Sequence, residues 1–256
     1  MHVVVINSWK EATPELAQEI AGALGMTAFD VQQRMVCGTP TVLASFADSQ
    51  QAKKYVIKLN QIGIATMLIE TEEVRHESDG ILVRHFQLNE SSLHIETGDG
   101  RSADIPYEKV DVLLPARSTL TYSEMITTTK NKLSLGQTIL TGIPISKKVE
   151  KEQEITSETS KKVLYLFVSR GQKPLIFSQE GMTYTGLGDN MKLSRGQNFN
   201  FLLNELHRLC PGAAYDDRLL QRIGQVRLLG STLNPETHLN LAVEILVNSL
   251  RRSRTN

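Results

Sequence analysis

The chain has 256 residues, of which 40% are hydrophobic and 22% are charged. This composition is typical of a soluble globular protein and excludes wholesale disorder, and the length suits two modules because domains cluster at about 100 to 150 residues. Lysine plus arginine and aspartate plus glutamate both number 28, so the net charge of zero excludes a global field that would attract nucleic acid or an anionic membrane.

The cysteines and the first residues indicate a compartment. Cys37 and Cys210 lie far apart and outside any CxxC spacing, which favours unpaired thiols in a reducing compartment. The stretch MHVVVINSWKEATPE turns polar too soon for a signal peptide, and no run of about 18 apolar residues predicts a membrane span. We therefore expect a cytoplasmic protein with no transmembrane segment.

Residues 1–71 predict a small α/β module. HVVVIN is a β-branched run typical of a strand buried on both faces, and TVLASF and IATMLIE are further strands. The N-cap signals that start three helices are Thr13 with Pro14, Thr27, and Asp48 or Ser49. The order βααβαβ predicts a three-stranded sheet with helices on one face. The second and third strands should run parallel to each other, with the first strand between them.

The stretches LGMTAFDVQQRMV and DSQQAKKYVIKLNQIGIATMLIE are similar to the C-terminal domain of the bacterial ribosomal stalk protein and to the Clp-protease adaptor family, which shares its fold. The adaptors hold a peptide's amino terminus with an Asn-Asp pair and a histidine. Asn7 matches the asparagine, but Ser8 replaces the acidic residue and residues 28–36 contain no histidine, nor the lysines of the stalk domain. The resemblance therefore implies a small scaffold that contacts other proteins.

Residues 80–212 predict a β-rich domain. ILVRHFQL and SLHIET alternate about the turn NESS, which pairs Leu88 with Leu93 and Phe86 with Ile95. Further short strands follow, and Ser194 caps an amphipathic helix. Strands closed by one helix resemble a pleckstrin-homology-type barrel, and the resemblance implies lipid or peptide binding.

Residues 117–162 form an insertion that is long for an ordinary loop. Its flanks are rich in Thr, Ser, Lys and Glu, and its centre is apolar. One alternative is a disordered linker, and the other is a long polar β-ribbon with an apolar tip. In the ribbon, the exposed apolar residues would mark an interface or a membrane contact, and they are Leu133, Leu135, Ile139, Leu140, Ile143 and Ile145.

Residues 213–256 predict a helical pair, the first helix capped by Asp216 or Asp217 and the second started by Asn234 and Pro235. The second helix is so apolar that we expect it to be buried, against the barrel or against a second copy of the chain. The basic ending RRSRTN is typical of a solvated helix end and less so of a nucleic-acid contact.

Three further places could carry a site. On the first hairpin, His85 lies across from Glu96 and His94 across from Gln87, which favours an exposed cross-strand pair over a metal site. Trp9 is either a packing residue or an exposed aromatic anchor. The segment GLGDNMKLSRG favours a turn and N-cap, with a small anion or lipid headgroup as the alternative ligand of Lys192, Ser194 and Arg195.

The sequence as a whole predicts an α+β protein with a βααβαβ module, a β-barrel-like middle domain with a capping helix, and a C-terminal helical pair. We expect no catalytic residues, cofactor or metal, because no nucleophile set, carboxylate pair or dinucleotide fingerprint stands in a recognisable context. The predicted function is a non-catalytic adaptor or scaffold that binds a protein partner. The alternative is a nucleic-acid- or ribosome-associated protein. The expected partner-binding residues are Trp9 and the six apolar residues of the insertion.

Overall fold

The computed structural model describes residues 1–9, 11–36, 38–75, 79–133, 146–168 and 173–254. These described residues form a mixed α+β structure with two sheets. It divides into two compact units, of which the larger comprises Met1–Ser118 and Lys161–Asn256 and the smaller comprises Thr119–Ser160.

The N-terminal sheet has three strands in the order β2-β1-β3, and β1 is antiparallel to both neighbours. The central position of the first strand and the parallel direction of the outer two are as predicted. The predicted caps at Thr13, Thr27 and Asp48 each accept a backbone hydrogen bond. The elements are β1 His2–Ser8, α1 Pro14–Leu24, α2 Ala28–Met35, β2 Thr41–Phe46, α3 Ser49–Gln61 and β3 Ala65–Glu70.

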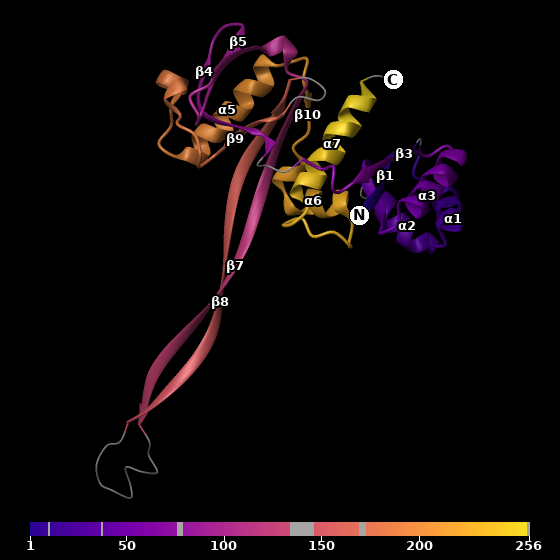
Figure 1. Ribbon diagram of the computed structural model, residues 1–256, viewed down its shortest axis with the longest axis horizontal. Helices are drawn as coiled ribbons and strands as arrows, with labels where there is room; N and C mark the ends of the chain where they lie inside the picture. The colour runs from indigo at the N-terminus through magenta and orange to yellow at the C-terminus, as the bar shows by residue number, and fades with distance from the viewer. Residues whose placement is uncertain (10, 37, 76–78, 134–145, 169–172, 255–256) are drawn as a thin grey trace, which may run out of the picture. The chain divides into compact units, whose positions relative to one another are not determined.

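Both faces of this sheet are covered (Figure 1). Val4 and Ile6 of β1 pack against α1, α2 and α3, whereas Val3 and Val5 pack in a core that includes the last helix, α7 (Leu239–Ser253). All four side chains are at most 1% exposed, which confirms the strand buried on both faces. The N-terminal residues are therefore packed together with the C-terminal ones in one unit.

The larger sheet has seven strands in the order β10-β7-β8-β9-β4-β5-β6. The predicted hairpin register is confirmed, because Phe86 pairs with Ile95 and Leu88 with Leu93. In the described residues this sheet is open, with β10 and β6 at its edges, so the pleckstrin-homology-type barrel is not confirmed. Its strands are β4 Ile81–Leu88, β5 Ser92–Thr97, β6 Ser102–Pro106, β7 Val112–Leu133, β8 Ser146–Phe167, β9 Leu175–Ser178 and β10 Ala214–Tyr215.

Helix α5 (Arg195–Leu209) covers another hydrophobic core of the larger unit, distinct from the core that includes α7. Ser194 caps it, as predicted, by accepting a hydrogen bond from the Gln197 amide at 3.2 Å. Phe199, Leu202 and Leu206 are at most 1% exposed and pack with the inward residues of β4, β5, β8 and β9. Short 3-10 helices also occur among the described residues, and those with assigned bounds are η2 Tyr107–Lys109, η3 Thr185–Asn190 and η4 Arg218–Leu220.

The predicted insertion, residues 117–162, includes residues of two long strands. β7 and β8 are neighbours in the sheet and each is 22 residues long, which is the conformation that the ribbon alternative requires. The predicted apolar tip, residues 134–145, lies outside the described residues.

The C-terminal helices begin later than the sequence indicates. Helix α6 is Arg222–Leu229 and α7 begins at Leu239 rather than at Pro235. The reason for the later start is a turn at Asn234, whose side-chain oxygen accepts from the Glu236 amide at 2.9 Å while its carbonyl accepts from His238. The end of α7 is fixed to the residue that precedes β7, because Arg251 Nε lies 2.6 Å from Asp111 Oδ2.

Candidate functional site

Two neighbouring cavities open along β4, β5 and β6, with volumes of about 590 and about 390 Å³. Cavities of this size are typical of pockets that hold a small ligand or side chains of a partner. Because they share lining residues, we treat them as one site and call it the β6 cleft. The shared residues are Ile81, Thr97, Arg101 and Lys173.

The wall of the larger cavity is mostly apolar and is part of the core under α5. Ile95, Ile105 and Leu175 line it and are only 3%, 8% and 5% exposed. The register produces this wall, because Ile95 pairs with Ala103 and Leu93 with Ile105, which places these side chains on one face of the hairpin. The side chain of Ala103 is short and exposed, so the larger cavity is open to solvent beside this residue.

Three cations line the β6 cleft. Arg101 forms an ion pair with Asp99 at 2.6 Å, and its hydrogen bonds hold the pKa of that carboxyl well below the usual range. Arg84 Nη1 donates to the Gly181 carbonyl at 2.8 Å. Among the described residues, no ion pair joins Arg84 or Lys173 to a carboxylate, so the β6 cleft has an excess of positive charge.

Strand β6 presents backbone groups along one side of the β6 cleft. The Thr97 amide donates to the Arg101 carbonyl at 2.9 Å. In an antiparallel pair every second residue is hydrogen-bonded to the neighbouring strand, so Arg101, Ala103 and Ile105 direct their backbone groups toward β5. Ser102 and Asp104 therefore direct their N–H and C=O groups away from β5. Since β6 is the last strand of the sheet in the part of the chain that the structure describes, these groups form an edge that another strand can pair with.

The residues predicted to bind a partner are not brought together here. Trp9 is half-buried and packs against the core of the N-terminal sheet, so its packing alternative describes it better than an exposed anchor. Leu133 is the last residue of β7. The other predicted residues lie outside the described ones, and they are Leu135, Ile139, Leu140, Ile143 and Ile145.

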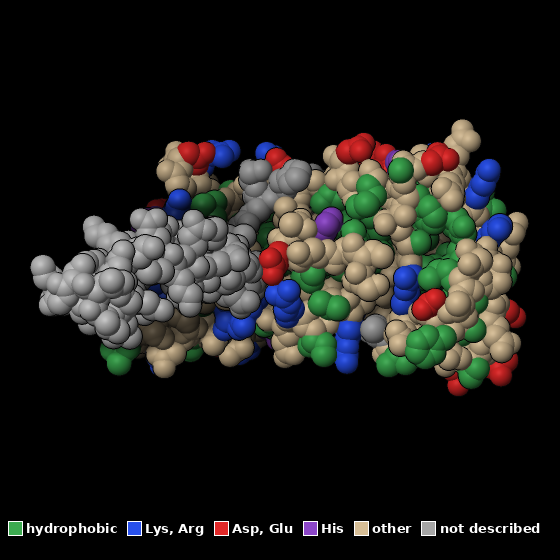
Figure 2. All heavy atoms as spheres, turned by 90° about the horizontal axis from the view of Figure 1, so that it is seen from below, with side chains coloured by type: hydrophobic (Ala, Val, Ile, Leu, Met, Phe, Trp, Pro, Cys, Tyr) green, Lys and Arg blue, Asp and Glu red, His purple; other side chains and the backbone are tan. Residues whose placement is uncertain are grey.

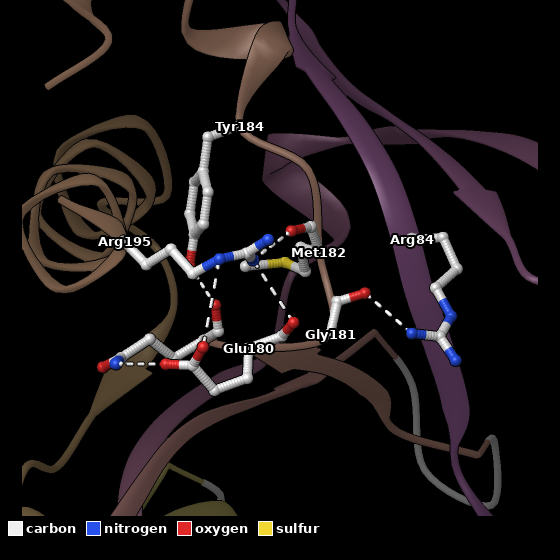
Figure 3. A network of polar contacts seen from close by, with 7 residues as sticks. Arg84, Glu180, Gly181, Met182, Tyr184 and Arg195 are labelled. Carbon is white, nitrogen blue, oxygen red and sulfur yellow. Dashed lines mark hydrogen bonds and ion pairs between the residues drawn. The ribbon is translucent and has the colours of Figure 1, made fainter. Parts of the chain in front are cut away.

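At the predicted anion site before α5, the charged side chains contact other residues of the same chain. Arg195 donates to the carbonyls of Glu180 and Met182 at 3.2 and 2.9 Å, and Figure 3 shows these residues lying between Arg195 and Arg84. The Lys192 ammonium lies 5.7 Å from the centre of the Phe201 ring. The guanidinium of Arg195 therefore fixes a loop, which weakens the prediction of an anion or headgroup there.

The predicted histidine pairs are part of an exposed network. His85 lies across from Glu96, as expected, and its Nδ1 is 2.8 Å from the Thr183 hydroxyl. His94 Nδ1 is 2.9 Å from Asp104 Oδ1. Among the described residues, no group of three or more potential ligands could hold a metal ion.

Helix α7, predicted to pack on the barrel or on a second copy, is covered by its own chain. Leu241, Ile245 and Leu246 are at most 3% exposed and share a core with the N-terminal sheet and with β7 and β8. This packing removes the basis for a homo-oligomer formed through the apolar stripe of this helix.

Sequence reasoning missed the β6 cleft. Its residues come from four strands and from the segments that connect them, and the alternation of ADIP with the charged turn GDGR was the one local signal that could have indicated a rim. Lys173 is far from this turn in sequence, so only the fold brings the cations together.

No family model matches this chain, and no curated protein or solved structure matches it either. Among the described helices, none combines the length and the apolar character that crossing a membrane requires.

Proposed function

We propose that this protein is a non-catalytic adaptor that binds an extended segment of a partner protein along β6. The observation that carries the proposal is the outward direction of the Ser102 and Asp104 backbone groups at the edge of a sheet. Extended peptides commonly add to such an edge, where main-chain hydrogen bonds give affinity and neighbouring pockets select side chains. The resemblances to stalk-like and pleckstrin-homology-type folds support an interaction role, and the expected location is the cytoplasm.

The length of the edge limits the partner segment. Pro106 ends β6 and has no N–H, so a partner strand pairs with the groups of two outward residues and with the Pro106 carbonyl. A short pairing of this kind gives modest affinity from the backbone alone. The β6 cleft supports the proposal because it adjoins the edge and offers a place for partner side chains.

The alternative, a nucleic-acid- or ribosome-associated protein, has less support. On the face shown in Figure 2, Lys and Arg side chains are interspersed with Asp and Glu, and the whole chain has no net charge. Binding to a phosphate backbone needs many cations on one surface, and the β6 cleft holds three beside the carboxylate of Asp99. A complex with RNA that weakens steeply with salt would favour this alternative.

The proposal is tested by proline at an outward position. A random peptide library displayed on phage is selected against the whole protein, and the affinity of the selected peptides is measured by fluorescence polarisation. Asp104→Pro removes an outward N–H without removing a β5 bond, and Asp104→Ala is the matched control that keeps this N–H. Because one hydrogen bond contributes about 1 kcal/mol, we expect the proline variant to bind about fivefold more weakly than the alanine variant.

A folding control completes the test. Ala103→Pro removes a bond of the β5–β6 ladder and should lower the unfolding midpoint, whereas Asp104→Pro should lower it far less. Equal affinities for Asp104→Pro and Asp104→Ala, or a library that yields no binding peptide, would contradict strand addition at β6.

A further inference from the structure

The β6 cleft specifies the side chains of the segment that pairs with β6. We infer that this segment carries a large apolar residue opposite Ala103 and an acidic residue two positions away, opposite Arg101. The inference rests on the proposed function, since it assumes that a strand pairs with β6. It follows from the faces of β6, from the shape of the cavity and from the position of the cations.

Alternate residues of β6 place their side chains on the side of the cavity. Ser102 and Asp104 would form the hydrogen-bonded pairs with an added strand, so Ala103 lies in a non-hydrogen-bonded pair, where opposite side chains are closest. Arg101, Ser102 and Ala103 all line the larger cavity, and Arg101 and Ala103 share the face of β6 whose Ile105 forms part of its wall. The partner residues opposite Ala103 and Arg101 therefore project on the side of the cavity.

The cavity beside Ala103 suits an apolar side chain of the partner. Ala103 leaves the cavity open beside the edge, and the walls behind it are isoleucines and leucine that belong to the core. A leucine, isoleucine or phenylalanine opposite Ala103 would bury its side chain there, whereas a polar side chain would lose its hydrogen bonds with water. This position therefore selects a large apolar residue.

The cations around Arg101 suit an acidic side chain of the partner. Arg101 directly precedes β6, and Lys173 lies beside the same cavity. Asp99 is the one carboxylate that lines the two cavities in the described residues, and it already pairs with Arg101. The excess positive charge of Lys173 and Arg84 thus favours aspartate or glutamate opposite Arg101, and it opposes lysine.

The probes are fluorescein-labelled threonine-rich peptides that contain either Leu-Thr-Glu or Glu-Thr-Leu. The two orders cover antiparallel and parallel addition, respectively. We expect one order to bind, and we expect replacement of its leucine by alanine to weaken binding about tenfold. Replacement of the glutamate by lysine should weaken it about fivefold, with the loss shrinking as salt rises.

Protein variants assign each effect to its contact. Lys173→Glu should reverse the preference between the glutamate and lysine peptides, while Lys53→Glu, on the exposed side of α3, should not. Ala103→Leu should fill the entrance and remove the advantage of leucine over alanine, while Ala65→Leu, at an exposed position of β3, should keep it. Circular dichroism confirms that each variant is folded.

The outcomes separate this inference from the proposed function. If library peptides bind through the β6 edge but Glu and Lys peptides bind equally, or if Ala103→Leu has no effect, the inference is wrong and strand addition stands. If no peptide binds to the edge, the proposed function fails first. If decanoate, a small apolar carboxylate, binds to the β6 cleft and no peptide displaces it, the site belongs to a small ligand and the inference is also overturned.

Discussion

The ion pair between Asp111 and Arg251 gives the sharpest stability prediction. Arg251 Nε lies 2.6 Å from Asp111 Oδ2, its side chain is 9% exposed, and its guanidinium lies 5.5 Å from the centre of the Phe167 ring. Asp111→Ala removes the carboxylate from this buried ion pair. Removing one partner of a buried pair typically costs 3 to 5 kcal/mol, and because Asp111 is 24% exposed we expect the lower end, about 3 kcal/mol.

The neighbouring arginine provides the comparison. Arg254 Nη1 lies 3.2 Å from Asp111 Oδ1 but its side chain is 41% exposed, so Arg254→Ala should cost less than about 1 kcal/mol. The double variant Asp111→Leu with Arg251→Met removes both charges together and should recover much of the loss. Asp104→Ala, which alters an exposed carboxylate, should change stability by less than about 0.5 kcal/mol.

The measurement is the free energy of unfolding from urea titration, followed by circular dichroism. The slope with denaturant should stay constant, because the variants alter a contact and not the surface exposed on unfolding. The reasoning would be refuted by a loss below about 1 kcal/mol for Asp111→Ala, or by a loss for Arg254→Ala as large as that for Asp111→Ala.

Two further predictions concern the core under α5. Gly186→Ala places a methyl group against the backbone carbonyl of Phe86, so it should lower the free energy of unfolding by about 2 kcal/mol or more, whereas Gly196→Ala, with open space around it, should not lower it. Urea titration of the two variants distinguishes the outcomes, and equal stabilities would contradict the predicted clash. Burial raises the pKa of the Cys210 thiol from 9.0 to about 11. The protonated thiol therefore makes its full contribution to the free energy of unfolding below pH 9, and this contribution is lost as the pH rises to about 11. Cys210→Ala should flatten stability across this window, and an unchanged pH profile would count against the thiol as the cause.

The sequence predicted the N-terminal sheet well because its signals are local. The β-branched run Val3–Ile6 and the caps Thr13 and Thr27 each determine a nearby structure. The first hairpin was predicted in register for the same reason, since Phe86 and Ile95 alternate about a short turn.

The failures depend on long-range pairing. The open edge at β6 and the parallel pairing of β4 with β9 are set by packing between distant segments, so a barrel could not be told from an open sheet by alternation alone. The same limit hid the β6 cleft, because Arg101 and Lys173 converge only after the strands pair. The turn at Asn234 was overlooked because the following proline also suits the first turn of a helix.

The two covered faces of the N-terminal sheet have a consequence for biosynthesis. A ribosome makes β1, β2 and β3 early, whereas α7, which shields Val3 and Val5, leaves the exit tunnel much later. Until then a nascent chain carries an uncovered apolar layer of the kind that chaperones bind. The N-terminal strands should therefore reach protease resistance only after α7 has been translated.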